Sequence, residues 1–379
     1  MIIQFGAKNF FCFREGVEIS FELSEKCPKN ISHGLKFSTV LGVKGANGSG
    51  KTNLLKILAF FKAFLCHSFQ NKPEGNLGTQ PFFDCEDGSE FFIEFEIDGI
   101  RYFYEFKCTP KKIVWEKGYR NKKRKKLVFA REGNEITFTT SEFKDLKIVR
   151  LRDNASIIST AHQYEMKCTE AIYSFFSRIF SNVNFFGWDR FKLDQDKLAH
   201  FLRANPVHLD FIRDKIRKYD TGVDDIKIFS KKDEKGKIRR FPVFFHENAG
   251  RMHKLLLHNE SSGTKTLYNE LALYKDALLR GGLLVVDEID VNLHPHIIPE
   301  LLELFCDRKN NPKLAQVIFT THNNEIMNYL GKYRTVLTEK RDNESFAFRL
   351  DEVPGDILRN DRAISPIYDS GKIGGVPKL

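Results

Sequence analysis

The sequence predicts a mixed α/β fold in which one sheet is assembled from the two ends of the chain. Two patterns lead to this prediction. A strand followed by a helix occurs at residues 38–64, and strands alternate with helices again at 264–320. Between these segments, residues 90–140 alternate apolar and polar side chains with a period of two, which is typical of an antiparallel sheet. We therefore expect an α/β sheet interrupted by an antiparallel lobe.

Local patterns predict the elements of the N-terminal half. Alternating apolar residues indicate two short strands within residues 1–23, and the apolar run at 38–44 indicates a third strand that enters a glycine-rich segment. Helical spacing follows at 53–64. In the antiparallel lobe, two alternating segments flank Asp98-Gly99, a dipeptide typical of a type I′ hairpin turn. Further alternating segments extend this hairpin into a meander.

The C-terminal half changes from helices to strands and back. Residues 141–220 have mostly helical spacing, and 223–247 is predicted to form strands joined by a charged hairpin. After these we expect a helix at 264–280, a buried strand at 283–286, a helix at 296–306, a strand at 315–320 and a short tail. The elements divide the chain into an N-terminal lobe (1–150), a helical and hairpin insertion (151–250) and a C-terminal lobe (251–379).

Composition excludes several classes of protein. The 379 residues are 41% hydrophobic and 29% charged, as in globular proteins and unlike disordered ones. The sequence contains no run of about 18 apolar residues, so no membrane span is predicted. The first residues lack the basic and apolar regions of a secretory signal. The seven cysteines include no C-x-x-C pair, which argues against a disulfide framework or a zinc knuckle. We therefore expect a cytoplasmic protein.

The chain is basic, with 60 Lys and Arg residues against 50 Asp and Glu residues and a formal net charge of +10. This surplus is compatible with a polyanionic partner but does not demonstrate one. Part of it lies in two predicted hairpin tips. The first basic tip comprises Arg120, Lys122, Lys123, Arg124, Lys125 and Lys126, and the second comprises Lys231, Lys232, Lys235, Lys237, Arg239 and Arg240. For the first tip, contact with a nucleic-acid backbone and a solvated sheet edge remain equally open, whereas we favour the solvated edge for the second.

The glycine-rich segment carries the most specific motif. Residues 45–52 read GANGSGKT and fit G-x-x-x-x-G-K-[ST] in full, after a strand and at the start of a helix. Glycines in this pattern let backbone N–H groups point at phosphate oxygens, and the helix start adds its positive dipole end. Lys51 is suited to the β- and γ-phosphates, and the Thr52 hydroxyl to Mg²⁺. The predicted phosphate-binding residues are Gly45, Asn47, Gly48, Ser49, Gly50, Lys51 and Thr52.

An acidic pair follows a buried strand further along the chain. Residues 283–286 are Leu-Leu-Val-Val, and Asp287 and Glu288 come directly after them. Because parallel strands present ligand-binding groups at their C-terminal edge, Asp287 is suited to Mg²⁺ and Glu288 to activating a water as general base. Acidic residues at a strand end are often only a helix cap. Their combination with the phosphate-binding segment favours catalysis.

Further motifs resemble those of ABC-type ATPases of the SMC, Rad50, RecF and OLD-like branch. Residues 260–264, which read ESSGT, resemble the signature motif of this branch. Residues 287–295 resemble its Walker B motif and D-loop, and residues 320–323 resemble the segment that carries the switch histidine, here His322. Residues 8–13 resemble its N-terminal segment.

Weaker similarities extend the resemblance over almost the whole chain. Residues 157–163 resemble the Q-loop, which implies that Gln163 is a ligand of Mg²⁺ or of the attacking water. Residues 219–226 and 371–377 resemble elements of stand-alone AAA15/AAA21-type ATPases. The resemblance implies an ABC/SMC-head-like P-loop ATPase fold with a mixed sheet, an antiparallel β lobe and an inserted helical subdomain.

Simpler interpretations of these residues remain open. Ser261 and Gly263 could only cap the following helix, and His322 could be an ordinary loop histidine. The order of the motifs favours the signature and the switch histidine. Gln163 stays undecided, because a glutamine at this place in the chain is unremarkable.

The resemblance implies slow ATP hydrolysis at a composite site. ATP and Mg²⁺ would lie between the P-loop, Asp287 and Glu288 of one subunit and the signature residues Ser261, Ser262 and Gly263 of another. The chain has one P-loop and one signature motif, so we expect a homodimer or higher homo-oligomer.

Segments that related proteins have and this sequence lacks reduce the number of functions to consider. Residues 53–260 contain neither the heptads nor the zinc hook of SMC and Rad50 proteins, and the roughly fifty residues after His322 are too few for the TOPRIM domain of OLD nucleases. The resemblance therefore implies a sensor or scaffold for a separate effector, such as a nuclease, TOPRIM-like protein or toxin, in anti-phage defence or abortive infection. The alternative is a RecF/Rad50-like ATP-dependent DNA-binding repair protein. A transporter ATPase is disfavoured, because the signature and D-loop are of the chromosome-associated type.

Overall fold

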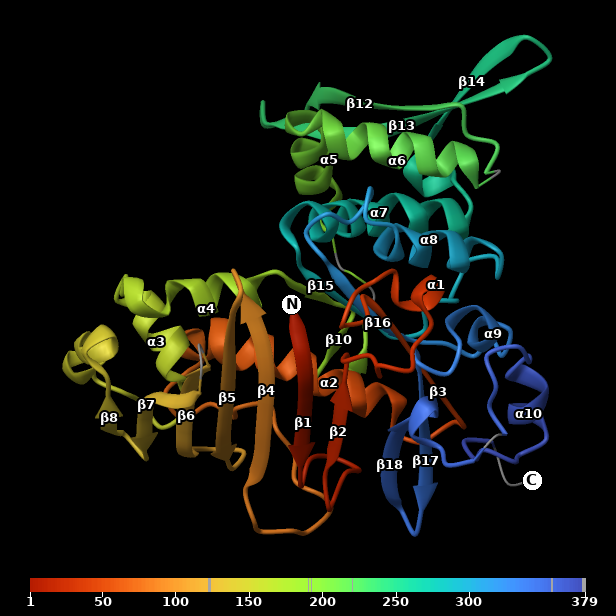
Figure 1. Cartoon of the computed structure of the whole chain (residues 1–379). Coiled ribbons are helices and arrows are strands. Elements are labelled where there is room, and N and C mark those ends of the chain that lie inside the picture. Colours follow the sequence, from red (N-terminus) through yellow and green to blue (C-terminus); the bar gives the residue numbers. More distant parts are fainter. Residues whose placement is uncertain (122–123, 190, 192, 220, 356, 377–379) are drawn as a thin grey trace.

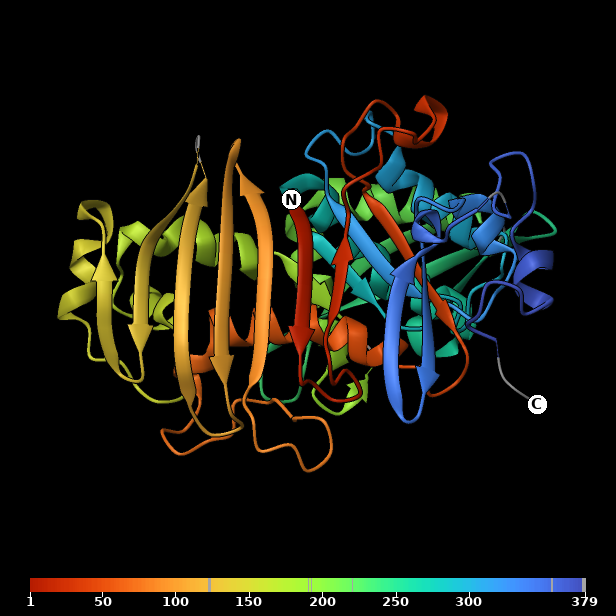
Figure 2. The same cartoon turned by 60° about the horizontal axis from the view of Figure 1, so that its bottom comes forward.

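A computed structural model describes residues 1–121, 124–189, 191, 193–219, 221–355 and 357–376. Two large sheets lie side by side in it, one antiparallel and one mostly parallel (Figures 1 and 2). A third, three-stranded sheet is separated from the parallel sheet by four helices, α5 (Gln195–Ala204), α6 (Pro206–Lys218), α7 (Ser262–Arg280) and α8 (Ile297–Cys306) (Figure 1). The predicted combination of a mixed sheet, an antiparallel lobe and a helical part is thereby confirmed.

The antiparallel sheet has the strand order β2-β1-β4-β5-β6-β7-β8. Its strands are β1 (Ile2–Lys8), β2 (Val17–Ser20), β4 (Ser89–Ile97), β5 (Ile100–Cys108), β6 (Ile113–Asn121), β7 (Lys125–Glu132) and β8 (Glu135–Thr139). Every second residue of β4 is buried from Ser89 to Phe95, as the period of two predicts. At the β4–β5 turn, Asp98 has φ 49° and Gly99 has φ 75°, which are the two positive values that a type I′ turn requires.

A buried polar network connects this sheet to helix α3 (Ile157–Gln163). Glu116 and Arg131 both have fully buried side chains, and Arg131 Nη1 lies 3.4 Å from Glu116 Oε2. The Tyr104 hydroxyl donates to Glu116 Oε1. The Ile157 backbone N–H donates to the same oxygen at 2.8 Å, so the first residue of α3 is held by a carboxylate of the sheet.

The parallel sheet has the strand order β18-β17-β3-β16-β15-β9. Its strands are β3 (Val40–Gly45), β9 (Ile179–Ser181), β15 (Leu283–Val286), β16 (Gln316–Thr320), β17 (Thr335–Arg341) and β18 (Glu344–Arg349). All neighbours are parallel except β17 and β18. The prediction that both ends of the chain build one sheet is confirmed. Three of its strands were not predicted: β9, which lies in the expected insertion, and the hairpin β17–β18, which lies in the expected tail.

The helices connect the sheets. Helix α2 (Lys51–Lys62) contacts β3, β15 and β16 of the parallel sheet and β1 of the antiparallel sheet. The others are α1 (Lys29–Ser32), α4 (Lys167–Ser177), α5 (Gln195–Ala204), α6 (Pro206–Lys218), α7 (Ser262–Arg280), α8 (Ile297–Cys306), α9 (Ile326–Leu330) and α10 (Ser365–Asp369). Across the described part of the chain, none of the helices combines the length and the apolarity needed to cross a membrane. All seven cysteines are free thiols.

The smaller sheet consists of β12 (Asp225–Lys232), β13 (Ile238–Asn248) and β14 (Arg251–Leu256), with β13 in the centre. Helices α5 and α6 cover one of its faces (Figure 1). Strand β14 leads through the short helix η4 (Leu257–Asn259) into α7. The chain thus passes directly from this sheet to the predicted signature residues.

Candidate nucleotide site

The P-loop connects the end of β3 to the start of α2. Gly48 has φ 74° and Gly50 has φ 102°, in the left-handed region that favours glycine. A Cβ at Gly50 would also lie 2.8 Å from Ser345 Oγ and 2.9 Å from Cys12 Sγ. Both the backbone conformation and the surrounding space therefore require glycine at this position.

Lys51 lies folded over this loop. Its ammonium donates to Gly45 O at 2.9 Å and to Ala46 O at 3.0 Å. Burial lowers the pKa of Lys51 from its ordinary value, while Asp287 and Glu288 oppose that shift. A phosphate group at the loop would give this poorly solvated cation a stronger partner than two carbonyl oxygens.

The hydroxyl of Thr52 meets the carboxylate of Asp287. Thr52 Oγ1 donates to Asp287 Oδ2 at 2.8 Å, and Thr320 Oγ1 donates to Asp287 Oδ1 at 2.5 Å. Asp287 is only 2% exposed. Hydroxyl and carboxylate oxygens are the ligands that Mg²⁺ prefers, so the donor set of Thr52 and Asp287 fits a magnesium ion beside the P-loop.

Glu288 and His322 lie together at the exposed edge of the sheet. Glu288 Oε1 is 3.7 Å from His322 Nε2, and the two side chains are 40% and 48% exposed. Glu288 has φ 54°, an uncommon value for a residue other than glycine, and its backbone N–H donates to Thr320 Oγ1 at 2.7 Å. The adjacent Asp287 and Glu288 thus have different environments, one buried beside Thr52 and one open to solvent beside His322.

Ser261, Ser262 and Gly263 form the start of α7. Ser261 Oγ accepts from the Thr264 backbone N–H at 3.1 Å, which is a helix cap. A Cβ at Gly263 would lie 3.0 Å from the carbonyl oxygen of Asn292, so this glycine permits a close approach to the loop after Glu288. The structure therefore places the start of α7 beside the loop at Asn292 of its own chain.

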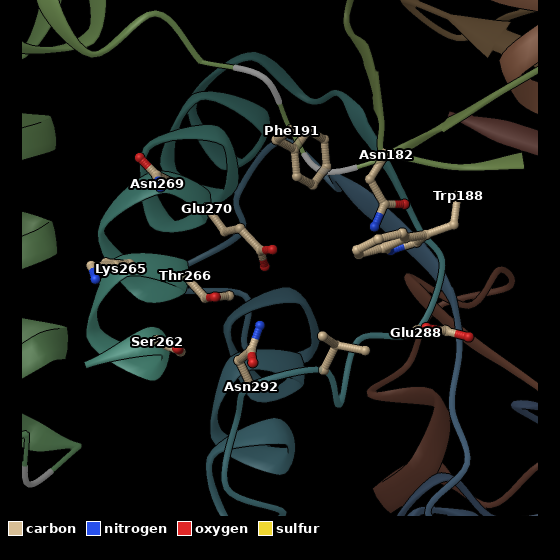
Figure 3. A pocket seen from close by; sticks show the side chains of 11 residues that line it. Asn182, Trp188, Phe191, Ser262, Lys265, Thr266, Asn269, Glu270, Glu288 and Asn292 are labelled. Atoms are coloured by element: carbon tan, nitrogen blue, oxygen red, sulfur yellow. The ribbon is translucent and has the colours of Figure 1, made fainter. Parts of the chain in front are cut away.

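A polar cavity of about 120 Å³, open to solvent, lies between α7 and this loop (Figure 3). Ser262, Glu270, Glu288 and Asn292 contribute to its lining, and Trp188 and Phe191 add two aromatic side chains. The carboxyl group of Glu270 points into it (Figure 3). Burial raises the pKa of Glu270 to about 7.

The structure does not bring Gln163 to this site, and we correct that part of the predicted magnesium ligand set. Gln163 is exposed at the end of α3. Helix α3 packs against η1 (Ala63–His67) and η2 (Ser68–Gln70), which continue the chain beyond the C-terminal end of α2. Thr52 is at the opposite end of that helix.

Asn182 is a site residue that the sequence did not reveal. It follows β9, the neighbour of β15, and donates from Nδ2 to Asp287 O at 2.9 Å while accepting from Asp287 N at 2.7 Å. Thr320 and Lys44 were also missed. Lys44 donates from Nζ to His322 O, and burial lowers its pKa to about 8. Lys44 and Thr320 lie at the ends of two strands that the sequence predicts, and this is the signal that could have identified them, whereas Asn182 follows β9, which has no recognisable pattern.

The N-terminal segment that resembles this branch reaches the P-loop. Cys12 Sγ accepts a hydrogen bond from Asn53 Nδ2 at 3.1 Å, and Cys12 O accepts from Ser345 N at 2.8 Å. Ser345 belongs to the hairpin β17–β18, which also contacts the loop through Thr338, whose Oγ1 is 2.6 Å from Ser49 Oγ. Segments from both ends of the chain therefore enclose the glycine-rich loop.

The first basic tip is partly engaged within the protein. Arg120 forms an ion pair with Glu142 at 2.6 Å, and Lys125 Nζ lies 3.3 Å from the centroid of the Phe103 ring. Arg124 and Lys126 are exposed and line an open groove with Arg120. Lys122 and Lys123 lie outside the described residues.

A glycine-rich loop before a helix, closed by a buried carboxylate at the end of a parallel strand, defines a P-loop ATPase-type site. The comparison with protein families agrees. Residues 40–328 match the family AAA_21, described as "AAA domain, putative AbiEii toxin, Type IV TA system". The match covers more than half of the chain and includes the P-loop, Asp287 and His322. The chain belongs to this family of P-loop ATPases.

Solved structures with a similar arrangement include SMC head domains. The head domain from Thermotoga maritima is 16% identical, with a TM-score of 0.44, and the match covers 94% of this chain and 99% of that one. An Smc head domain with a coiled coil and joint from Pyrococcus yayanosii is 12% identical, with a TM-score of 0.49 and coverages of 97% and 99%. At scores below 0.5, these likenesses carry no functional argument. No curated protein matches the sequence.

Proposed function

We propose that this protein is an ABC-type ATPase that hydrolyses ATP with Mg²⁺ and dimerises around the nucleotide. The hydrogen bond from Thr52 to Asp287 is the observation that carries the proposal, because it joins the two oxygen ligands that a magnesium ion on the β- and γ-phosphates needs. When bound, Mg²⁺ would neutralise negative charge on the phosphates. Glu288 would accept a proton from the attacking water, and His322 would orient the reacting groups beside it.

The signature residues support the proposal that a second copy of the chain completes the nucleotide site. Ser261 and Ser262 are exposed, and the hydrogen bonds of Ser261 remain within the start of α7. A hydroxyl group and the backbone N–H groups at the start of a 19-residue helix suit a γ-phosphate. In the proposed dimer, each chain offers these groups to the nucleotide on the P-loop of the other.

Replacing the general base tests the dimer. Glu288→Gln should abolish hydrolysis while the protein still binds ATP, so the ATP-bound dimer should accumulate. Retained nucleotide and molar mass by light scattering measure this outcome. Lys51→Ala, which removes the phosphate-binding cation, should retain no ATP and should not assemble. A Glu288→Gln protein that neither retains ATP nor changes its assembly would show that the composite-site proposal is wrong.

We further propose that the ATP-dependent dimer is a sensor or scaffold that controls a separate effector, a nuclease or toxin, in anti-phage defence. The support is the family description, which names a toxin of a toxin–antitoxin system. The proposal predicts that the product of a neighbouring gene co-purifies with the chain, and that Lys51→Ala changes the amount recovered. A complex unaffected by nucleotide and by Lys51→Ala would contradict ATP control.

The second candidate is a RecF/Rad50-like DNA-binding repair protein. The exposed side chains of Arg124 and Lys126 beside an open groove favour it. In this case, duplex DNA should bind in the presence of ATP, and affinity should fall steeply with salt. Charge reversal of Arg124 and Lys126 that leaves duplex affinity intact would exclude a role for the first basic tip.

A further inference from the structure

The three-stranded sheet β12–β14 has one covered and one open face. Ile226 and Phe244, which pair across β12 and β13, are both fully buried on the side of α5 and α6. Because side chains alternate along a strand, the neighbouring residues point to the opposite side. We call this side the outer face. It carries Lys227, Phe229 and Lys231 from β12, Phe241 and Phe245 from β13, and Lys254 from β14.

Aromatic rings and ammonium groups are interleaved on the outer face. The rings of Phe229 and Phe245 are tilted by 32° with centroids 6.4 Å apart. Lys227 Nζ lies 5.1 Å and Lys254 Nζ lies 5.7 Å from the centroid of the Phe245 ring. Phe229 is 41% exposed, while Phe245 is 9% exposed and forms the floor of the cluster. The cluster thus offers an accessible ring flanked by cations.

This sheet also carries a large share of the basic surplus of the chain. Residues 225–256 contain nine Lys and Arg residues and four Asp and Glu residues, a surplus of five out of the net +10. By the same alternation, the outer face itself carries four cations, Lys227, Lys231, Arg239 and Lys254, and two carboxylates, Asp225 and Glu247, so it stays positive by two charges. Asp225 is shared between Lys227, at 3.5 Å, and Arg213 of α6, at 3.1 Å. Asp233 accepts from Arg239 in the second basic tip, away from Phe245. The charge of the outer face is therefore complementary to a polyanion.

We propose that the outer face of β12–β14 binds single-stranded nucleic acid. Exposed rings on an open antiparallel sheet can stack on unpaired bases, and flanking lysines can contact the phosphates between them. A duplex keeps its bases stacked inside and offers no base plane to Phe229. An acidic protein would use the lysines but would gain no stacking contact. The combination of ring and cation favours the single strand over both.

The proposed surface lies outside the nucleotide site, so binding to it can be tested without ATP. Fluorescence anisotropy with a labelled 20-nucleotide single-stranded DNA measures affinity, and RNA of the same sequence shows whether the sugar matters. Tighter binding of either single strand than of the matching duplex supports the proposal. Equal or tighter binding of the duplex would overturn it. So would failure of both single strands to bind, or equally effective competition by polyglutamate.

Matched variants assign the binding to the outer face. Phe229→Ala should weaken single-strand affinity about tenfold, the order expected for one stacked base, and Phe229→Trp should retain it. Phe138 is 42% exposed on β8 of the other sheet, so Phe138→Ala is the control for loss of an exposed ring. Equal effects of Phe229→Ala and Phe138→Ala would overturn the proposal. Because Phe229 is exposed, the fold should tolerate its replacement, which circular dichroism verifies.

Charge reversal tests the phosphate contacts separately. Lys227→Glu together with Lys254→Glu should reduce the slope of log affinity against log salt by about 1.4, which corresponds to two phosphate contacts on a single strand. The control is Lys340→Glu, at an exposed position of β17. A salt slope unchanged in the double variant would show that the outer face is not the binding surface.

Discussion

Thr320 and Asp287 join two neighbouring parallel strands at the point where both end. The Thr320 hydroxyl donates to Asp287 Oδ1 at 2.5 Å and accepts from the Glu288 backbone N–H at 2.7 Å. Since Asp287 Oδ2 accepts from Thr52, both oxygens of this buried carboxylate are oriented by threonines. The same hydroxyl also fixes the unusual backbone of Glu288. One side chain therefore positions the proposed metal ligand and the proposed base.

Removal of this hydroxyl should impair catalysis more than nucleotide binding. Thr320→Val keeps the shape but leaves Asp287 Oδ1 and the Glu288 N–H without their partner, which should cost about 1–3 kcal/mol of stability. We expect kcat for ATP hydrolysis to fall at least tenfold with little change in KM, because the P-loop contacts remain. Thr320→Ser, which restores the hydroxyl, should recover most of kcat. A Thr320→Val enzyme with normal kcat would exclude this positioning role.

Glu270 should make stability depend on pH. Burial raises the pKa of its carboxyl to about 7 in the folded chain, against an ordinary value of 4.5. Between pH 4.5 and 7 the folded state therefore binds more protons than the unfolded state, and stability falls as pH rises. Glu270→Gln should be more stable than the parent protein above pH 7, by about 1–3 kcal/mol. The difference should vanish below pH 4.5. Urea unfolding at pH 4.5, 6 and 8 measures it, and an equal difference at all three values would contradict the shift.

The elements that the sequence predicted have strong local patterns. Strand β15 is buried along its whole length and follows from its apolar run, and β4 and β5 follow from strict alternation around Asp98-Gly99. The missed strands lack such patterns. Strand β9 has three residues, too few to show a period, and every residue of β14 is exposed because α5 and α6 do not cover that edge. A periodic pattern arises only in a strand with a buried face and enough residues to repeat. These strands are instead specified by the strands that pair with them in the fold.

The site was predictable where one motif supplies several neighbouring residues. The P-loop fixes its own geometry through glycine and the helix start, so Lys51 and Thr52 were identified from spacing alone. Asn182 binds the backbone of Asp287, a partner 105 positions away that no local pattern specifies. Gln163 is the reverse case, a residue that the sequence assigned to the magnesium site and that the structure places elsewhere. Its motif similarity was weak, and only the tertiary arrangement could show that α3 packs beyond the far end of α2.

Arg131 should be essential for the stability of the antiparallel lobe. Its guanidinium is fully buried beside Glu116. Burial raises the pKa of Glu116, and the charge of Arg131 opposes part of that rise. Arg131→Met leaves this carboxyl without its cation and should cost about 3–5 kcal/mol. Urea unfolding followed by circular dichroism measures the loss.

The matched control for this ion pair is the double variant Arg131→Met with Glu116→Gln, in which neither charge remains. It should recover part of the lost stability, because an amide costs less to bury than an unpaired carboxylate. The single variant Glu116→Gln completes the comparison. If the double variant loses as much stability as the two single variants lose together, the two side chains do not interact.

His246 and Glu260 connect the proposed nucleic-acid surface to the signature residues. His246 lies on β13, and its Nε2 is 2.9 Å from Glu260 Oε1, directly before Ser261. If a single strand on the outer face shifts β13, this contact transmits the shift to the start of α7. We therefore expect single-stranded DNA to change the rate of ATP hydrolysis in the parent protein.

Glu260→Gln should uncouple the two sites, because the amide weakens the contact with His246. The variant should bind the labelled single strand with unchanged affinity, while its own rate of ATP hydrolysis should no longer change when DNA is added. Steady-state phosphate release with and without the oligonucleotide measures the response. Phe229→Ala is the control, since it should lose binding and response together. A Glu260→Gln protein that still responds fully would show that the signal reaches α7 by another route.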